Sequence, residues 1–371
     1  MVMLYSRPSL DYLSHWANML FNTRISLLLC LAIIIGGCAT RSLDPSTDTV
    51  DSERAESTSV TVQKKLDPTA APSTSSQVKN TLGTSANLRL KTARFAHASA
   101  SDGKRLYVFS GYGKQGYLTD VEIIDPQTAE VTVLANKVLP RGYFSAVYDQ
   151  QHSIYLIGGV SHQTDDVREE QRIEVFDIPS QKVTVIGTIP EPLRDNKAVY
   201  LDGYIYLVGG ASYNASTGYK LISSASLWRF DIKHRTWQQL ANMPSAKSTA
   251  LVAGKQGLFA IGGEQNLESL TNVERYDVAS NTWHRMTSLP HPVSAHSAVM
   301  LNDTLWFFAN EVAAQNCYYM TLNSNTWKIA KFDYQSALYT SANVLGDTLY
   351  VIGGNAGKGK SFMAQIQAFQ H

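Results

Sequence analysis

A short apolar segment that ends in a pair of small residues recurs six times along the chain. Its clearest copy is 154–159, Ile-Tyr-Leu-Ile-Gly-Gly, and the others start at residues 106, 205, 258, 305 and 349. Four apolar residues in a row, without polar alternation, indicate a strand that is buried on both faces. The glycines that follow allow a close approach that a Cβ atom would obstruct. A repeat of about 44 to 53 residues, built from short strands and glycine turns, predicts a propeller or a solenoid.

Each repeat reads as four strands, which we name a to d in chain order. Strand a ends in a turn such as Asp102-Gly103, and strand b is the apolar segment itself. Strand c ends in an aspartate whose side chain can hydrogen-bond the backbone two residues on and open a turn. The predicted strands c include 121–125, 173–177, 227–231 and 273–277. Strand d begins with Val or Trp and ends near a proline, which is tolerated because this strand forms the outer edge.

This order of residues resembles the kelch repeat, in which a glycine pair precedes an aromatic residue and an aspartate, followed by Thr or Ser and Trp. The fourth repeat carries the pattern most fully, at Gly262-Gly263, Tyr276-Asp277 and Asn281-Thr282-Trp283. The resemblance covers residues from about 94 to 371. It implies an all-β fold, a six-bladed kelch β-propeller in which each blade covers the next.

The first and last repeats together predict how the ring closes. The sixth repeat ends after strand c, because the chain stops at His371. A strand at 87–91, just before the first strand a, is placed where a strand d belongs. We therefore expect it to complete the last blade, which gives a propeller domain of residues 86–371. The fifth repeat departs most from the pattern, with Ala309-Asn310 in place of the glycine pair and Thr321 in place of the aspartate.

Residues 1–37 have the pattern of a secretory signal. Arg24 precedes the apolar run 25–35, which is short for a membrane span, and small residues lead to Cys38. The Ile-Gly-Gly-Cys sequence there resembles a bacterial lipobox, which implies that Cys38 is lipidated and becomes the first mature residue. The residues before Met19 fit a signal peptide poorly, so Met19 is a candidate start. An ordinary anchor helix is the alternative interpretation of the apolar run.

Residues 38–85 are expected to form a lipidated, flexible linker. They are rich in Ser, Thr, Pro, Ala and Asp and poor in large apolar residues, so burial cannot offset their chain entropy. Such a segment would hold the propeller away from the bilayer. Ala39 follows the cysteine where an Asp would retain a lipoprotein in the inner membrane. The resemblance therefore implies an outer-membrane lipoprotein whose propeller lies in the periplasm of the cell envelope.

Charge and cysteine content narrow the choice of function. The formal net charge is +1, which argues against a nucleic-acid-binding protein because such proteins normally carry a strong basic excess. Cys30 and Cys38 belong to the N-terminal apolar stretch, so Cys317 is the single cysteine of the repeat region. No intramolecular disulfide framework is expected there.

The starts of the six strands a are expected to meet at the mouth of the central channel. Their alignment gives two columns three residues apart. The first column holds Arg94, Arg141, Arg194, Ser245, Val293 and Ala337. The second column holds His97, Phe144, Lys197, Ser248, His296 and Thr340. The predicted ligand-binding residues are therefore Arg94, His97, Arg141, Arg194, Lys197 and His296.

Converging guanidinium groups suit a carboxylate or phosphate, because they offer bidentate hydrogen-bond donors. Kelch adaptor proteins use arginines at this place to hold acidic peptides, and the resemblance implies a similar partner here. We expect an anionic small molecule, a glycan or an acidic peptide or protein. The alternative is that these basic residues belong to the repeat pattern and bond neighbouring loops.

Candidate catalytic chemistry is weak in this sequence. His291 and His296 are five residues apart, but a zinc site needs further ligands and none is visible nearby. We expect no cofactor, and a non-enzymatic binding module is the preferred function. The alternative is a periplasmic sugar epimerase or mutarotase of the sialic-acid type, since one such family has kelch repeats. It would need a general acid/base near an arginine, for which Glu264 with Arg194 or Arg141 are the conceivable partners.

Overall fold

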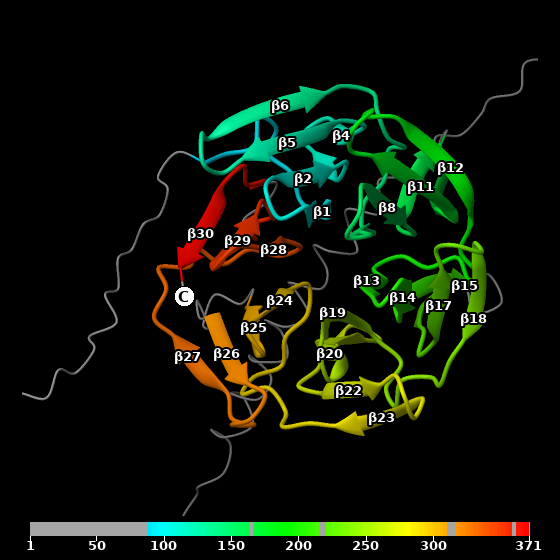
Figure 1. The fold of residues 1–371 in the computed structure, drawn as a ribbon, viewed down its shortest axis with the longest axis vertical. Coiled ribbons are helices and arrows are strands. Elements are labelled where there is room, and N and C mark those ends of the chain that lie inside the picture. Colours follow the sequence, from blue (N-terminus) through cyan, green and yellow to red (C-terminus); the bar gives the residue numbers. More distant parts are fainter. Residues whose placement is uncertain (1–87, 164–165, 215–219, 310–316, 358–360, 371) are drawn as a thin grey trace, which may run out of the picture. The chain divides into compact units, whose positions relative to one another are not determined.

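A computed structural model describes residues 88–163, 166–214, 220–309, 317–357 and 361–370. These residues form six antiparallel sheets arranged in a ring around a central axis (Figure 1). Strand a of each sheet lies innermost and the later strands lie progressively outward. The predicted six-bladed propeller is therefore confirmed. The predicted signal region, the lipidated Cys38 and the linker lie outside the described residues.

The first three blades each contain four strands in the order a-b-c-d. Blade 1 consists of β1 (Ala98–Ser101), β2 (Leu106–Phe109), β5 (Val121–Asp125) and β6 (Glu130–Leu134). Blade 2 consists of β7 (Ser145–Tyr148), β8 (Ser153–Ile157), β11 (Arg172–Asp177) and β12 (Val183–Thr188). Blade 3 consists of β13 (Lys197–Leu201), β14 (Tyr204–Val208), β17 (Leu227–Asp231) and β18 (Thr236–Gln239).

The last three blades follow the same order, although the sixth sheet has three strands within the described residues. Blade 4 consists of β19 (Ser248–Gly254), β20 (Gly257–Gln265), β22 (Val273–Asp277) and β23 (Thr282–Arg285). Blade 5 consists of β24 (Ser297–Leu301), β25 (Thr304–Phe308), β26 (Cys317–Thr321) and β27 (Lys328–Ala330). Blade 6 consists of β28 (Ser341–Leu345), β29 (Thr348–Ile352) and β30 (Ile366–Gln370).

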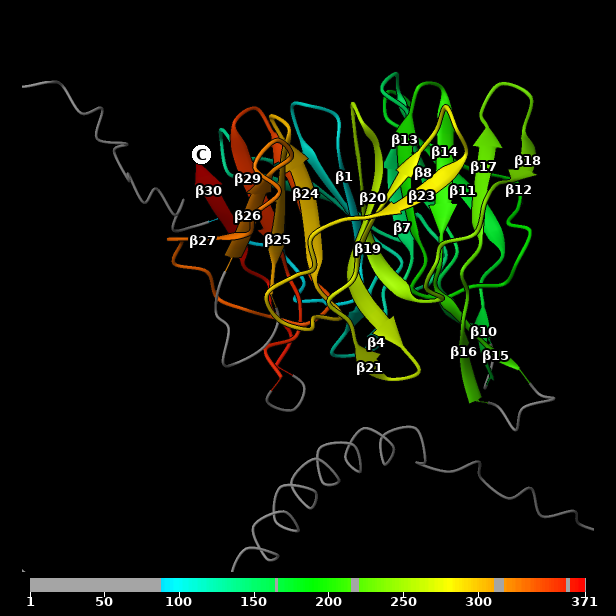
Figure 2. The ribbon, with the colours of Figure 1, turned by 90° about the horizontal axis from the view of Figure 1, so that it is seen from below.

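The connections between strands b and c form small hairpins at one end of the ring. Figure 2 shows β4, β10, β15, β16 and β21 projecting from this end, which we call the b–c face. The hairpin strands are β3 (Tyr112–Gly113) with β4 (Gly116–Tyr117), β9 (Val160–Gln163) with β10 (Asp166–Glu169), and β15 (Ala211–Asn214) with β16 (Lys220–Ser223). In blade 4, β21 (Glu268–Ser269) pairs with the end of β20. The described residues contain no helix that could cross a membrane.

Strand b is buried on both faces, as its unbroken apolar sequence predicts. In β2, Leu106 and Val108 belong to the core cluster shared with blade 6, whereas Tyr107 and Phe109 belong to the cluster shared with blade 2. Each such side chain stabilises the fold by roughly 1.5–3 kcal/mol when it leaves water. Every blade therefore depends on both neighbours for its core, which is why the sheets close into a ring.

The repeat pattern encodes two kinds of polar contact at strands c and d, one within each blade and one between neighbouring blades. In the first four blades a carboxylate oxygen of the last residue of strand c accepts a backbone N–H from the turn that follows. The indoles of Trp237, Trp283 and Trp327 donate to backbone carbonyl oxygens of the preceding blade at 3.0, 2.8 and 3.1 Å. The recurring tryptophan thus holds adjacent outer strands together.

The segment before blade 1 closes the ring against blade 6. Leu90 N–H donates to the Ala364 carbonyl at 2.7 Å, and Ile366 N–H donates to the Leu88 carbonyl at 3.1 Å. The Leu88 and Leu90 side chains are buried in the cluster that joins blades 6 and 1. The predicted closing strand is present as a short bridge at 88–90 instead of a regular strand, and residues 86–87 lie outside the described part.

Candidate functional site

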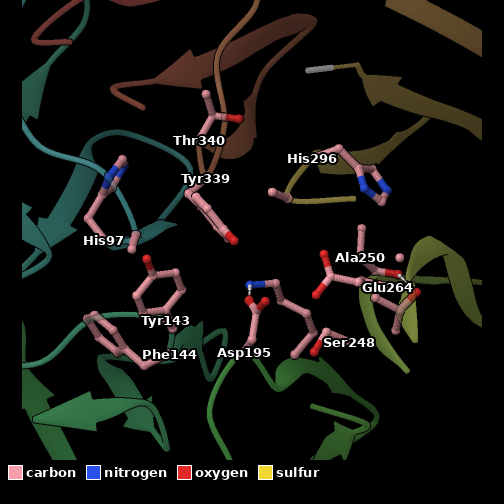
Figure 3. Close-up of a pocket in the computed structure, with 15 residues that line it drawn as sticks. His97, Tyr143, Phe144, Asp195, Ser248, Ala250, Glu264, His296, Tyr339 and Thr340 are labelled. Atoms are coloured by element: carbon pink, nitrogen blue, oxygen red, sulfur yellow. Dashed lines mark hydrogen bonds and ion pairs between the residues drawn. The ribbon is translucent and has the colours of Figure 1, made fainter. Parts of the chain in front are cut away.

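A cavity lies on the propeller axis where the strands a begin (Figure 3). All six blades contribute to its wall. The lining residues are Ala96, His97, Tyr143, Phe144, Asp195, Lys197, Ser248, Thr249, Ala250, Gly263, Glu264, Ala295, His296, Tyr339 and Thr340.

A chain of backbone hydrogen bonds runs around this cavity. The residues Ala96, Tyr143, Asp195, Ala295 and Tyr339 each precede a strand a and have left-handed φ angles of 49–57°. The N–H of Asp195 donates to the Tyr143 carbonyl, and the N–H of Tyr143 donates to the Ala96 carbonyl. The N–H of Ala96 donates to the Tyr339 carbonyl, whose own N–H donates to Ala295. Five of the six blades are therefore linked to one another at the axis.

Blade 4 interrupts this chain because it is one residue shorter. The second glycine of blades 1 and 3 donates its N–H to the carbonyls of Arg141 and Lys247 in the next blade, which makes these two residues equivalent. The strand-a residues opposite the last residue of strand b are Ser145 and Ala250. The step from Lys247 to Ala250 in blade 4 is thus one residue shorter than the step from Arg141 to Ser145 in blade 2. A register shift in β19 occurs where the other blades have the residue with a left-handed φ angle.

The interruption leaves space at the axis. Among the described residues, the carbonyl of Asp195 and the N–H of Ala295 are the two ends of the hydrogen-bonded chain and take no backbone partner. Ser248 and Glu264, which pair with each other in blade 4, form the wall at this point. A Cβ atom at Gly263 would lie 1.9 Å from the Ser248 carbonyl oxygen, so glycine is required where β20 passes β19.

These equivalences correct the predicted columns at blades 3 and 4. The residue equivalent to Arg94 and Arg141 is Leu193 in blade 3 and Lys247 in blade 4. Arg194 instead matches Gly142, because each forms an isolated β-bridge with the residue that follows the glycine pair of its own blade. The predicted alignment was wrong there by one residue in blade 3 and by two in blade 4, since it counted along segments of unequal length.

Arg94 is fully buried within blade 1. Its guanidinium group bonds Asp120 at 2.8 and 2.9 Å and Glu122 at 2.6 Å. Glu122 also accepts the N–H groups of Lys91 and Thr92. The group is therefore held by carboxylates of its own blade and does not line the cavity.

Arg141 repeats this arrangement in blade 2, and Lys247 repeats it in blade 4. Arg141 bonds Glu174 at 2.6 Å and the carbonyls of Gly158 and Arg172. Lys247 Nζ lies 3.2 Å from Glu274. Burial raises the pKa of Glu174, and the Arg141 guanidinium opposes that shift. Each cation compensates a buried carboxylate, so the geometry assigns Arg94, Arg141 and Lys247 a structural role.

A repeated glutamate in the sequence was the signal for these ion pairs. Glu122, Glu174 and Glu274 each lie three residues before the aspartate that ends strand c. The sequence reasoning noted the aspartate that ends strand c but assigned nothing to this glutamate. A glutamate at the same place in three repeats, together with a basic residue before strand a, indicates a buried ion pair within each blade. This pattern favours the alternative that the basic residues have a structural role in the repeat.

Arg194 lies at the rim of the b–c face. Its guanidinium carbon is 4.5 Å from the centroid of the Tyr213 ring, and its Nε is 3.3 Å from Glu169. Only 12% of its side chain is exposed, and it is not among the residues that line the cavity. The structure therefore does not bring the three predicted arginines together.

The other three predicted residues, His97, Lys197 and His296, do meet at the cavity. Burial, with the charges of Arg94 and Lys197, lowers the pKa of His97 to about 3. Burial also lowers the pKa of His296 to about 3, and the Ile261 carbonyl offsets only part of the shift. Both imidazoles are therefore neutral at pH 7. His97 Nε2 bonds the Ser341 hydroxyl at 2.8 Å, whereas neither ring nitrogen of His296 has a hydrogen bond of normal geometry.

Carboxylates outnumber cations at the cavity. Lys197 Nζ lies 3.6 Å from Asp195. Glu264 also lines the cavity, and its carboxylate has no ion-pair partner within the described residues. Burial raises the pKa of Glu264, and the charge of Asp195 adds to the shift. Two carboxyl groups thus face one ammonium group, so the site is acidic where the sequence predicted a basic one.

The cavity is small. It offers about 30 Å³ to the centre of a water molecule, which is space for two or three waters at roughly 10–15 Å³ each. Within the described residues, no three His, Cys, Asp or Glu side chains are placed to hold a metal ion.

Comparison with known proteins agrees with the repeat pattern. A family model described as the KLHDC2/KLHL20/DRC7 Kelch-repeats domain matches residues 129–310, and one described as the Kelch motif matches residues 93–137. Kelch-like protein 25 of Xenopus tropicalis is 26% identical over 211 residues, which cover 54% of this chain and 33% of that protein.

Two further relatives give the same picture. Kelch-like protein 35 of Mus musculus is 30% identical over 189 residues, or 47% of this chain and 30% of that protein. Alpha-scruin of Limulus polyphemus is 28% identical over 122 residues, or 32% of this chain and 13% of that protein. The chain spans about a third or less of the length of these relatives.

Proposed function

Because the chain is a kelch-repeat β-propeller, we propose that it is an interaction module that binds a protein partner at its b–c face. Kelch propellers typically serve as such modules. The observation that carries the proposal is the set of exposed apolar side chains on the b–c connections of blades 3 and 4. Tyr213, Ile222 and Leu267 are 36, 40 and 54% exposed. Tyr213 and Ile222 belong to β15 and β16, which project from this face (Figure 2), and Leu267 lies between β20 and β21.

The small cavity and the hairpins favour a protein over a free small molecule. The space on the axis accepts only a few atoms, whereas the surrounding hairpins offer a broad surface with aromatic and aliphatic side chains. Tyrosine is enriched in protein interfaces because it combines apolar area with a polar tip. A partner that lies across the hairpins can also insert one group into the cavity.

The anionic ligand expected from the sequence has less support than a protein partner. Arg94 and Arg141 are fully buried and paired with Glu122 and Glu174. The remaining cation that lines the cavity, Lys197, already faces Asp195. An acidic group entering the cavity would therefore meet more carboxylate than ammonium.

Site-specific photocrosslinking in the native cell tests the binding face. A benzoyl-phenylalanine at position 213 or 267 is expected to form an adduct with one and the same partner protein. The matched positions are Val185 and Ile329, which are also exposed, at 55 and 58%, but lie on outer strands. Adducts from the outer positions alone would contradict the proposed face.

The proposed attachment is a lipid on Cys38, which would hold the propeller at the outer membrane and in the periplasm of the cell envelope. Support comes from the Ile-Gly-Gly-Cys sequence after an apolar run. Metabolic labelling with an alkyne fatty acid is expected to mark the wild type and not the Cys38→Ser variant. A variant that loses the label but still fractionates with membranes would favour the anchor-helix alternative.

The mutarotase alternative finds no matching geometry. It requires a general acid/base beside an arginine that binds the carboxylate of the sugar. Glu264 lines the cavity, but Arg141 is paired with Glu174 and Arg194 stacks on Tyr213 at the rim. Accelerated anomer exchange of sialic acid, followed by NMR with the purified protein, would nevertheless overturn this preference.

A further inference from the structure

We propose that the axial cavity receives the cationic tip of a single lysine or arginine side chain, with Glu264 as its counter-ion. The proposal rests on the interaction module proposed above for the origin of that side chain, which belongs to the partner. The charge balance, the groups without partners, the aromatic wall and the size of the cavity each support it.

The charge balance favours a cation. Asp195 and Glu264 both line the cavity, and Lys197 alone opposes them. The Lys197–Asp195 pair is loose, at 3.6 Å, and both side chains are partly exposed. Glu264 is left without an ion pair in the described part of the chain. A second cation would complete the balance, and the low pKa values of His97 and His296 prevent these residues from supplying it.

A buried histidine lies in the same wall. His296 is 6% exposed and lines the cavity, and neither of its ring nitrogens has a hydrogen bond of normal geometry, although the Ile261 carbonyl is close enough to affect its pKa. His97 Nδ1, on the opposite side in Figure 3, also has none. A neutral imidazole keeps one acceptor nitrogen, and a buried acceptor left unpaired costs about 1–3 kcal/mol. The wall beside Glu264 therefore contains hydrogen-bonding capacity that the described residues leave unused.

Two tyrosines complete the wall. Tyr143 and Tyr339 meet edge to face with their ring centroids 4.9 Å apart, and both line the cavity. Figure 3 shows the Tyr339 hydroxyl directed toward the space between Asp195 and Glu264. Burial raises the pKa of Tyr339, and the nearby Tyr143, Asp195 and Glu264 raise it further. Aromatic rings and carboxylates around one small space are the surroundings that stabilise a lysine or arginine cation.

The size of the cavity sets the size of the ligand group. A volume of about 30 Å³ for water centres suits the tip of one side chain, such as an ammonium or guanidinium group. The one-residue-shorter segment of blade 4 interrupts the ring of backbone hydrogen bonds beside this space, so the wall at Glu264 differs from the wall that the other five blades form.

Ligand-observed NMR on the full-length protein in detergent tests the proposal with defined probes. The probes are the peptides Ac-Gly-Arg-Gly-NH₂ and Ac-Gly-Lys-Gly-NH₂, with the citrulline and glutamate analogues as matched neutral and acidic controls. We expect saturation transfer to the cationic side chains and none to the two analogues. Glu264→Gln is expected to weaken binding about tenfold, the scale of one lost charge-assisted hydrogen bond.

Glu268→Gln is the matched control variant, because Glu268 is an exposed carboxylate of β21 that does not line the cavity. It should bind the cationic peptides as the wild type does. Preferential binding of the glutamate peptide would overturn the proposal, and so would equal binding by Glu264→Gln and wild type. Failure of these titrations with successful crosslinking at 213 and 267 would remove the cation site and keep the proposed function. Successful titrations without crosslinking at 213 and 267 would keep the cation site and remove the protein-binding face.

Discussion

The buried ion pairs inside the blades and the cavity on the axis are both built from charged residues next to strand a, but they differ in how completely their charges are paired. Arg94 and Arg141 each meet a glutamate of their own blade at 2.6 Å and are fully enclosed. At the cavity, Glu264 lacks an ion pair and His296 lacks a hydrogen bond of normal geometry within the described residues. Removing one partner of a buried ion pair leaves an uncompensated charge and destabilises the fold, whereas the open carboxylate at the cavity is the group that the proposed cation would pair with.

The largest expected effect comes from breaking a compensated pair. Arg141→Ala leaves Glu174 buried without its cation, so the free energy of unfolding should fall by about 3–5 kcal/mol. Urea denaturation of the full-length protein measures the change. Lys255→Ala is the control, since Lys255 pairs with Asp303 in solvent and such pairs contribute little. Equal losses in the two variants would contradict the structural role of Arg141.

A smaller effect is expected from pH. Because the folded pKa of His296 is about 3, below its ordinary value of about 6.5, the unfolded chain binds a proton more readily. The contribution of neutral His296 to the free energy of unfolding is therefore complete above pH 6.5 and is lost as the pH falls toward 3. Between pH 6.5 and 5.5 this histidine should cost the fold about 1 kcal/mol.

The measurement is the difference in urea stability between wild type and His296→Gln across this pH range. Taking the difference removes the opposing titration of Glu264, whose pKa is raised by burial and which both proteins share. The wild type should lose more stability than the variant as the pH falls. Parallel pH profiles would show that His296 is not held neutral by burial.

The smallest effect is expected at the uncompensated carboxylate. Glu264→Gln removes a partly buried charge that has no ion pair in the described chain, so stability should stay the same or rise by no more than about 1 kcal/mol. Glu174→Gln should lower stability, because it deprives the buried Arg141 of its counter-ion. Thermal unfolding of the two variants side by side checks this contrast. A loss of stability in both would mean that Glu264 is also a structural residue.

Most of the architecture could be predicted because its signals are local and repeated. The apolar segment at 154–159 must be buried on both faces, and the aspartates that end strand c bond their own turns. The closing role of the segment before blade 1 also followed: the sixth sheet has three strands within the described residues, and Leu88 and Leu90 supply further pairing beside them. Six copies of one pattern constrain the fold far more than any single copy does.

The site was predicted only in part, because it depends on one-residue differences between repeats. His97, Lys197 and His296 do line the cavity, yet Lys197 was aligned one position away from its true equivalents. The segment between Lys247 and Ala250 of blade 4, which lies beside Glu264 at the cavity, can be recognised as short only when the backbone hydrogen bonds of these two residues are known. Charge alone could not show that two of the arginines are enclosed.

By itself, the sequence determined six sheets, their order and the way the ring closes, since these depend on the period of apolar residues and on turns within a few residues. The tertiary structure decided which charges are compensated and which remain open. That choice depends on pairs some 30 residues apart, such as Arg141 with Glu174, and on contacts across the axis between different blades. Such contacts form only after the blades have packed, and no local pattern specifies them.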